Sequence, residues 1–407
     1  MDQYSDIKVG CEAVRRAARE AAGQTANARN AAIRSIADRI LSEGDAILDA
    51  NSRDTDLAEG QLPTHMLRRL RLDETKLGLL CHRLLSLASE PDPLEDKTAN
   101  TCLPELEVAV RRAPLGAVAF VYECRPELTA LAVAACVKTG NAALLCSGFA
   151  TSETDAAILK AVRSALRDSA YPPEAVGYID PLHSSVPDAL CKMRGAVDLL
   201  VLKDGQLSDD VGECVPVVRS TGGVSHVYID KACDIPLAVR TTVRTLYCDD
   251  ERGENEDTSV VLVHHDAAAE FFEALQIAVH PYSPEMRGCP VTREYLADAI
   301  PASRGDWTAL QDSGANVLTV RVVESMEQAT AHVNLYGTAG IDAIMTCNKA
   351  RAALFESMTD SRTVCVNVPP LRSVVSDGVS AALGIEGLTA LTRKKYLVSS
   401  VAERSAI

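Results

Sequence analysis

Apolar residues recur at helical spacing through residues 8–90, which predicts a block of helices at the start of the chain. The stretch AAIRSIADRILSEGDAILDANSRD shows this spacing clearly, with Gly44 and Asn51 as predicted helix breaks. LPTHMLRRLRLDETKLGLLCHRLLSLASE forms a second helical block, and PDPL at 91–94 ends it.

Short apolar runs then alternate with helical patterns. ELEVAVRR has the alternation of an exposed strand, whereas GAVAFVYE and NAALLCSG are typical of buried strands. LTALAVAACVKTG predicts a helix that ends at Gly140, and SETDAAILKAVRSALRD predicts another. AVGYID and AVDLLVL continue the series. Because strands and helices alternate through right-handed crossovers, the pattern predicts an α/β fold with a parallel sheet.

A second unit begins after the turn STGG, which follows Arg219. Its predicted elements are, in order, the strand SHVYID, a helix around DIPLAVRTTVRTL, the strand SVVLVHH and the helix AAAEFFEALQIAV. VNLYGTAGIDAIMT and RTVCVNVPP follow. The stretch from about Asp377 is expected to return to the first unit or to contact a neighbouring subunit.

Composition narrows the classes of partner. The net charge of −15 argues against binding to nucleic acid or to an anionic membrane, since both need a positive surface. The start, MDQYSDIKVG, lacks the apolar core of a secretory signal, so we expect a soluble, cytoplasmic protein. The thirteen cysteines are scattered without a CxxC pair. We therefore expect reduced thiols, mostly in the core, and no metal site.

Several segments together resemble γ-glutamyl phosphate reductase, a family on the aldehyde-dehydrogenase fold. They are RRAPLGAVAFVYECRPELT, KTGNAALLCSG, VDLLVLKDG, VPVVRSTGGVSHVYID and AHVNLYGTAGIDAIMT. The similarity covers essentially the whole chain in the right order, and the combination of YExRP with NxYGxxxxDAI is specific.

The resemblance implies separate segments of the chain for cofactor binding, catalysis and oligomerisation. It implies a Rossmann-type cofactor domain at 1–223 with an arm strand at about 104–112, a catalytic domain at 224–372, and an oligomerisation segment at 373–407. It also implies the reduction of γ-glutamyl phosphate to the semialdehyde by NADPH, in proline biosynthesis. A cysteine thiolate would attack the acyl phosphate, and hydride would reduce the resulting thioester. A homo-oligomer is expected, and a glutamate-kinase-like protein or a paralogue is a further candidate partner.

The segment that should hold the catalytic cysteine departs from the family pattern. In the run CDDERGENEDTSVVLV, Asn255 falls at the position of the family's cysteine, while an ungapped count gives Gly253. Cys248 is the only nearby thiol and a poor substitute nucleophile, because it lies about seven residues early in an acidic run. Packing at the end of a helix is the alternative role for Cys248.

Other candidate site residues match the family motifs. Arg125 and Asn334 are candidate catalytic residues, with strand capping and folding as their alternative roles. The candidate substrate residues are Tyr122, Glu123, Tyr336 and Asp342. The candidate cofactor residues are Lys138, Gly148, Lys203, Gly222 and Gly223. Cys146 and Ser147 stand where the family has an arginine and a glycine, which predicts weak or absent NADPH binding.

Three functions remain open from the sequence. The first is a reductase of γ-glutamyl phosphate or a similar acyl phosphate that uses a relocated thiol. The second is a degenerate homologue that serves as a scaffold or regulator of a kinase or an active paralogue. The third is an enzyme that uses the acyl-phosphate pocket for non-redox chemistry. The departures near Asn255 favour the loss of the ordinary hydride reaction.

Overall fold

The computed structural model describes most of the chain. The described residues are 3–95, 98–103, 106–179, 186–203, 207–208, 215–219, 224–247, 258–308, 317–370, 378–383, 385 and 387–400. The chain divides into two compact units, Met1–Thr221 with Ser376–Ile407 (unit 1) and Gly222–Val375 (unit 2). Unit 2 is thus inserted into the sequence of unit 1.

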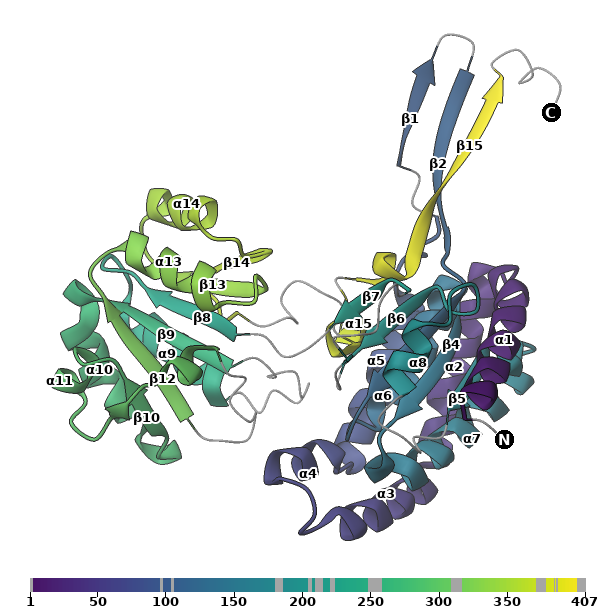
Figure 1. Cartoon of the computed structure of the whole chain (residues 1–407), viewed down its shortest axis with the longest axis horizontal. Helices are drawn as coiled ribbons and strands as arrows, with labels where there is room; N and C mark the ends of the chain where they lie inside the picture. Colours follow the sequence, from purple (N-terminus) through teal and green to yellow (C-terminus); the bar gives the residue numbers. More distant parts are fainter. Residues whose placement is uncertain are drawn as a thin grey trace. The chain divides into compact units, whose positions relative to one another are not determined.

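Unit 1 starts with helices and continues with alternating strands and helices (Figure 1). Its helices are α1 (Gln3–Ala22), α2 (Ala26–Ser42), α3 (Gly44–Ala58), α4 (Thr64–Leu70), α5 (Glu74–Ser89), α6 (Glu127–Thr139), α7 (Ser152–Asp168), α8 (Val186–Cys191) and α15 (Gly378–Leu383), with short 3₁₀ turns η1 (Phe149–Thr151), η2 (Pro173–Ala175) and η5 (Leu388–Leu391). Its strands are β1 (Thr98–Leu103), β2 (Leu106–Pro114), β3 (Ala117–Tyr122), β4 (Ala142–Ser147), β5 (Val176–Ile179), β6 (Leu199–Leu202), β7 (Val217–Arg219) and β15 (Thr392–Ser400).

The main sheet of unit 1 has the strand order β5-β4-β3-β6-β7, and all of these pairs are parallel. The predicted parallel sheet that contains 117–122 and 142–146 is confirmed. A separate sheet has the order β1-β2-β15, in which the C-terminal strand pairs antiparallel with β2 from Thr392↔Pro114 to Ser400↔Leu106 (Figure 1).

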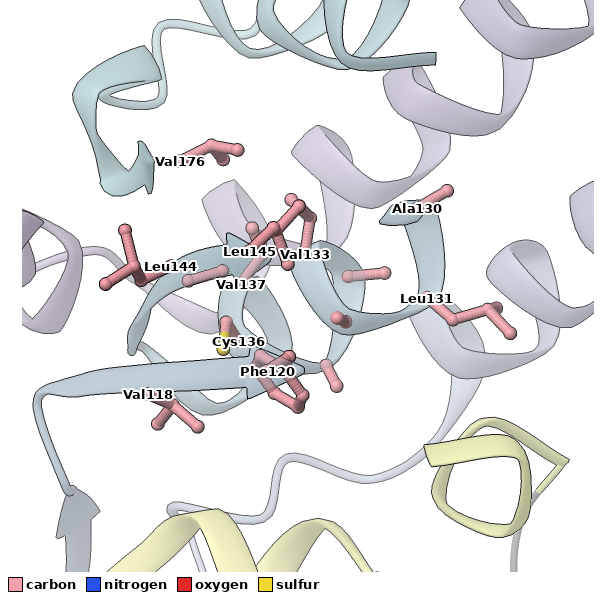
Figure 2. Packing of buried hydrophobic residues seen from close by; sticks show 14 of the residues in the cluster. Val118, Phe120, Ala130, Leu131, Val133, Cys136, Val137, Leu144, Leu145 and Val176 are labelled. Atoms are coloured by element: carbon pink, nitrogen blue, oxygen red, sulfur yellow. The ribbon is translucent and has the colours of Figure 1, made fainter. Parts of the chain in front are cut away.

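Helix α6 is the central helix of unit 1. It is apolar on all sides, and every residue from Leu128 to Thr139 is buried, as expected for a helix enclosed by other elements. It packs against α2, α5, α7 and α15. Figure 2 shows Leu131, Val133 and Val137 of this helix in the same cluster as Phe120 of β3 and Leu145 of β4. This packing fixes the carboxyl ends of β3 and β4, where the pocket described below lies.

The predicted end of α6 at Gly140 is confirmed. Gly140 has φ 70°, a left-handed conformation that closes the helix and suits glycine, and its N–H donates to Val137 O at 3.1 Å. A Cβ at this position would lie 3.0 Å from Pro114 Cγ.

Gly140→Ala is therefore expected to destabilise unit 1 by about 1–2 kcal/mol. Gly78→Ala is the matched control, since Gly78 lies inside α5 on its exposed side, where a Cβ would meet nothing within 4 Å. The same substitution there should stabilise by about 0.5–1 kcal/mol. Urea unfolding followed by far-ultraviolet circular dichroism measures the change in the free energy of unfolding for both variants. A change of the same sign in both would contradict the capping role of Gly140.

The predicted helix break at Gly44 is confirmed, whereas the predicted break at Asn51 is wrong. α2 ends at Ser42 and α3 runs through Asn51, which is 2% exposed. The Asn51 amide donates to Leu70 O at 2.8 Å and accepts from Leu72 N at 2.7 Å. Because this side chain bonds the backbone of another segment, it does not compete with the hydrogen bonds of its own helix.

Unit 2 is a second α/β unit. Its strands are β8 (Val224–Ile229), β9 (Thr258–His264), β10 (Glu285–Gly288), β11 (Ile300–Pro301), β12 (Val317–Val323), β13 (Ile341–Met345) and β14 (Thr363–Val366). Its helices are α9 (Ile235–Tyr247), α10 (His265–Val279), α11 (Thr292–Tyr295), α12 (Arg304–Thr308), α13 (Met326–Tyr336) and α14 (Lys349–Met358), with the 3₁₀ turn η3 (His280–Tyr282). The strand order is β11-β10-β12-β9-β8-β13-β14, and all pairs are parallel. Apolar clusters cover both faces of this sheet.

Candidate active site and family

A pocket of about 750 Å³ opens at the carboxyl ends of β3 and β4 in unit 1. Open parallel sheets bind their ligands at this edge. The lining residues come from three places. Helices α3 and α4 and the turn between them contribute Asp54, Leu57, Ala58, Gln61, Leu62 and Met66. The ends of β3 and β4 and the start of α7 contribute Val121, Tyr122, Glu123, Cys124, Cys146, Ser147, Gly148, Phe149, Ala150 and Ser152, and α8 contributes Val186 and Pro187.

The turn after β3 presents its side chains to this pocket in an unusual backbone conformation. Cys124 has φ 51°, in the left-handed region that a residue with a side chain rarely adopts. Its neighbour Glu123 is exposed and lies over Gly148, where an added Cβ would come within 3.3 Å of Glu123 Cγ. The absence of a side chain at Gly148 therefore lets the two strand ends approach each other.

A buried network of hydroxyl and carboxyl groups supports the wall of the pocket. The Tyr122 hydroxyl lies 2.7 Å from Thr129 Oγ1, and Thr129 Oγ1 donates to Asp155 Oδ1. Burial raises the pKa of Asp155 to about 7, against hydrogen bonds from Ser147, Thr129 and Thr151 that lower it. Burial also raises the pKa of Tyr122 well above its usual value. Tyr122 is 1% exposed, so it acts here as a neutral hydrogen-bonding group that fixes the strand end.

Asp54 is a site residue that the sequence analysis missed. Its carboxylate accepts from Glu153 N at 3.2 Å, from Thr154 N at 2.8 Å and from Thr154 Oγ1 at 2.6 Å. The side chain from α3 thus caps the start of α7, where a helix favours negative charge. In the sequence, Asp54 has the pattern of a polar position inside a helix, so no local signal distinguishes it.

The structure brings together only part of the predicted site in unit 1. Tyr122, Glu123 and Gly148 line the pocket. Arg125 and Lys203 are 5% and 4% exposed and are not among the described lining residues. Gly222 and Gly223 lie outside the described residues, and so do Cys248 and Asn255.

Lys138, a candidate cofactor residue in the sequence analysis, lies away from the described lining of the pocket. It lies in the last turn of α6, at the edge of the sheet opposite to the strand ends that form the pocket. It is 2% exposed, and its Nζ donates to Asn30 Oδ1 at 2.9 Å and to Glu90 O at 2.6 Å. These bonds tie α6 to α2 and to the end of α5, so the structure gives Lys138 a packing role and does not bring it to a cofactor.

The three candidates in unit 2 make contacts within that unit. Asn334 donates to Met358 O at 2.9 Å and accepts from Asp360 N at 3.0 Å, which fixes the segment after α14. Asp342 is 1% exposed and accepts from His226 N at 2.7 Å. Tyr336 packs beside His332, with 4.6 Å between the ring centroids. The structure thus gives each of these residues a structural contact.

All six described thiols for which a pKa shift is resolved are poor nucleophiles. Cys146 lines the pocket, but burial and then Glu123 raise its pKa to about 12. Burial raises the pKa of Cys11, Cys81, Cys136, Cys233 and Cys365 as well. A raised pKa leaves little thiolate near neutral pH. The expectation that all cysteines are reduced is wrong at Cys191, which is disulfide-bonded.

The described part of the chain lacks two further features. It contains no group of three or more His, Cys, Asp or Glu side chains placed to hold a metal ion. None of its helices has the length and apolarity that crossing a membrane requires.

Comparison with known proteins identifies the family. The chain is 33% identical over 393 residues to a γ-glutamyl phosphate reductase of Xanthomonas campestris pv. campestris strain B100, which covers 92% of this chain and 93% of the relative. A γ-glutamyl phosphate reductase of Xylella fastidiosa strain 9a5c is 30% identical over 418 residues, 97% of this chain and 98% of the relative. The chain belongs to the γ-glutamyl phosphate reductase family. No protein-family model matches it.

Solved structures agree with this family and with the aldehyde-dehydrogenase-like fold. The γ-glutamyl phosphate reductase of Thermotoga maritima superposes with a TM-score of 0.84 at 25% identity, over 97% of this chain and 98% of that one. The glyceraldehyde-3-phosphate dehydrogenase GapN of Methanocaldococcus jannaschii, solved with NADP, has a TM-score of 0.68 at 14% identity, over 98% and 94% of the two chains. The second likeness shows the fold alone, and the predicted fold is confirmed.

Among its described residues, the pocket of this γ-glutamyl phosphate reductase family member is lined by no side chain of positive charge. A phosphate monoester needs hydrogen-bond donors and positive charge. The described lining residues include two carboxylates, Asp54 and Glu123, and no lysine, arginine or histidine. The N–H groups of Glu153 and Thr154 already donate to Asp54.

Proposed function

We propose that this chain is a γ-glutamyl phosphate reductase-like protein that has lost the thioester-based reduction of acyl phosphates. The observation that carries the proposal is the run CDDERGENEDT before β9, in which the position expected for the family's cysteine is Asn255 or, in an ungapped count, Gly253. An amide cannot replace a thiolate as the nucleophile of this reaction. The raised pKa values of six described thiols, Cys146 in the pocket among them, support the same proposal.

The acidity of this run also opposes the ordinary substrate. Asp249, Asp250, Glu251, Glu254, Glu256 and Asp257 surround one cation, Arg252. A carboxylate about 4–6 Å from an acyl phosphate costs on the order of 1 kcal/mol when it is partly screened. In this proposal unit 1 remains a cofactor-binding-type unit, unit 2 remains a catalytic-type unit without its nucleophile, and NADPH binds weakly.

The test is the oxidation of glutamate semialdehyde in the presence of phosphate, with NADP⁺ and with NAD⁺. The wild-type chain and Cys248→Ser are measured beside an active family member. We expect both proteins to fall at least about 10⁴-fold below the active relative while keeping a folded circular-dichroism spectrum. Wild-type turnover that Cys248→Ser abolishes would restore a relocated nucleophile. Wild-type turnover that survives in Cys248→Ser would also overturn the proposal, because another group would then carry the reaction.

A second role, as a binding partner, is favoured by the sheet β1-β2-β15. β15 is the last strand in this order, and three consecutive large apolar side chains on it are exposed, Tyr396 by 63%, Leu397 by 51% and Val398 by 57%. Such an edge is a site for strand pairing with another chain. We propose that it mediates homo-oligomerisation, or pairing with an active paralogue. Leu397→Lys should then shift the protein to a smaller species in sedimentation, and an unchanged species would refute this role.

A further inference from the structure

Two thiols of unit 2 lie on neighbouring connections at the carboxyl edge of its sheet. Cys233 belongs to the connection between β8 and α9, and Cys347 belongs to the connection between β13 and α14. Because β8 and β13 are paired neighbours and run parallel, both connections leave the sheet at the same place. Neither thiol is in a disulfide, and Cys347 is exposed. The fold therefore brings together two free thiols that lie far apart in the sequence.

A backbone hydrogen bond fixes the distance between the two connections. Cys347 N donates to Ala232 O at 2.7 Å, and Ala232 is the residue directly before Cys233. Chains joined by such a bond lie about 5 Å apart. The two Cα atoms of a disulfide are about 4.4–6.8 Å apart, so a disulfide between these positions suits the backbone as it stands.

The buried carboxylate of Asp230 holds both connections in this arrangement. Its Oδ2 accepts from Ala232 N of the first connection at 3.4 Å and from Thr346 Oγ1, beside the second connection, at 2.8 Å. Arg351 of α14 compensates the charge, with Nε 2.8 Å from each oxygen of the carboxylate. Since one buried group already orders both chain segments, joining them costs little further conformational entropy.

The two thiols differ in reactivity. Cys347 is exposed, so a small oxidant in solution reaches its sulfur. Cys233 is half-buried, and burial, followed by the charges of Asp230 and Cys347, raises its pKa to about 11. Because Coulomb interactions weaken with distance, the effect of Cys347 on Cys233 indicates that the two sulfurs lie near each other. The exposed thiol is therefore the one that reacts first, and the half-buried thiol reacts with its product.

We propose that Cys347 and Cys233 are a modification site for hydrogen peroxide and form a reversible disulfide. The Cys347 thiolate attacks one peroxide oxygen, so that an S–O bond forms, the O–O bond breaks, and the departing hydroxide takes up a proton to become water. The product at Cys347 is a sulfenic acid. The Cys233 thiol attacks this sulfur, so that the S–S bond forms, the S–O bond breaks, and a second water leaves. The two thiols together lose two electrons, and the peroxide is reduced to water.

Peptide mapping of the full chain tests the proposal. The folded protein is treated with hydrogen peroxide, its remaining thiols are alkylated, and its peptides are analysed by mass spectrometry without reduction. We expect a linked pair of peptides that contain Cys233 and Cys347, two hydrogen atoms lighter than the two free peptides. Dithiothreitol should separate them. A product in which Cys347 is a sulfinic acid while Cys233 is alkylated, or in which Cys347 has not reacted, would overturn the proposal.

Cys233→Ser tests the order of the two steps. Without the second thiol the reaction should stop at the sulfenic acid, so labelling of Cys347 by dimedone should rise severalfold over the wild type. Cys289→Ser is the matched control, since Cys289 is another half-buried free thiol of unit 2. It should leave both the linked pair and the dimedone labelling unchanged. Equal labelling of Cys347 in the wild type and in Cys233→Ser would show that Cys233 does not react with it.

Oxidation should also stabilise unit 2 against urea. A bond between positions 233 and 347 closes most of this unit into one loop and so restricts its unfolded chain. The urea midpoint read by the fluorescence of Trp307, which lies within that loop, should rise after peroxide treatment and return after dithiothreitol. Cys347→Ser should show no such rise while keeping the circular-dichroism spectrum of the wild type. A rise of the same size in Cys347→Ser would assign the stabilisation to another site and overturn the proposal.

Discussion

Asp342→Ala is expected to destabilise unit 2 by about 3 kcal/mol or more. Asp342 Oδ1 accepts from His226 N at 2.7 Å and lies 2.9 Å from His226 Nδ1, and Oδ2 accepts from Ser361 Oγ at 2.6 Å. His226 is fully buried in β8, so removing the carboxylate leaves its backbone N–H and its ring nitrogen without this partner. Each buried polar group left unsatisfied costs about 1–3 kcal/mol.

Trp307 provides the measurement. It is the single tryptophan of the chain, it is 8% exposed, and its ring lies 5.2 Å from that of His332 in unit 2. Urea unfolding followed by its fluorescence therefore reports on this unit. Ser361→Ala is the matched control, since it removes one of the same hydrogen bonds from a half-buried hydroxyl and should cost about 1 kcal/mol. If Asp342→Ala unfolded at the wild-type midpoint, the structural role would be wrong and the predicted substrate role would regain support.

The second large effect is a loss of stability in acid that arises from His332. This side chain of α13 is 3% exposed, and neither ring nitrogen has a hydrogen-bond partner among the residues that the structure describes. Burial, followed by the neighbouring His226 and Arg321, lowers the pKa of His332 from 6.5 to about 3. The groups that face it are His226 from β8, Arg321 from β12, Trp307 from α12 and Tyr336 from its own helix.

The sign follows from the folded pKa lying below the unfolded value. Between pH 6.5 and 3 the unfolded chain binds a proton at this histidine that the folded chain does not, so stability falls as the pH falls. The part due to His332 is about 2 kcal/mol at pH 5 relative to pH 7. Urea midpoints at pH 7 and pH 5, read by Trp307, should show this loss in the wild type.

His332→Phe should remove that part of the pH dependence, because a phenyl ring fills the same site and does not titrate. The control His280→Gln changes an exposed histidine in η3 and should leave the loss between pH 7 and pH 5 as in the wild type. A loss of the same size in His332→Phe would show that another group causes the acid sensitivity.

The secondary structure of unit 1 was predictable because its signals are local. α6 ends at Gly140, which adopts the left-handed φ that glycine favours, so the glycine in the sequence predicts the end of the helix. The apolar run 117–122 forms a buried strand, as its apolar character predicts. Asn51 was mispredicted because its partners, Leu70 and Leu72, lie in another segment. A helix interior accepts asparagine when tertiary contacts satisfy its amide, and no local pattern records such contacts.

The positions of the candidate site residues were predictable where those residues follow strands. Tyr122, Glu123 and Gly148 follow buried strands, so they reach the carboxyl edge of the sheet by geometry alone. Lys138 precedes β4 in the sequence and therefore lies at the edge of the sheet opposite to the pocket. It was a candidate cofactor residue because of its positive charge. Asp54 comes from α3, and its approach to α7 depends on how helices pack, which a sequence pattern does not specify.

The pairing of β15 with β2 has a consequence for the order of synthesis. Arg112 of β2 contacts Thr392 of β15, which lies 280 residues later in the sequence. Such contacts complete unit 1 only after all of unit 2 has been synthesised. During synthesis, β2 leaves the ribosome before β15 has been made. Until then, the edge of β2 that later pairs with β15 is unpaired and accessible to other chains. Unit 2 has a contiguous sequence and folds in the meantime. A tag or truncation at the C-terminus therefore acts on the last folding step of the first-made unit, and refolding should be slower than for a chain whose ends close locally.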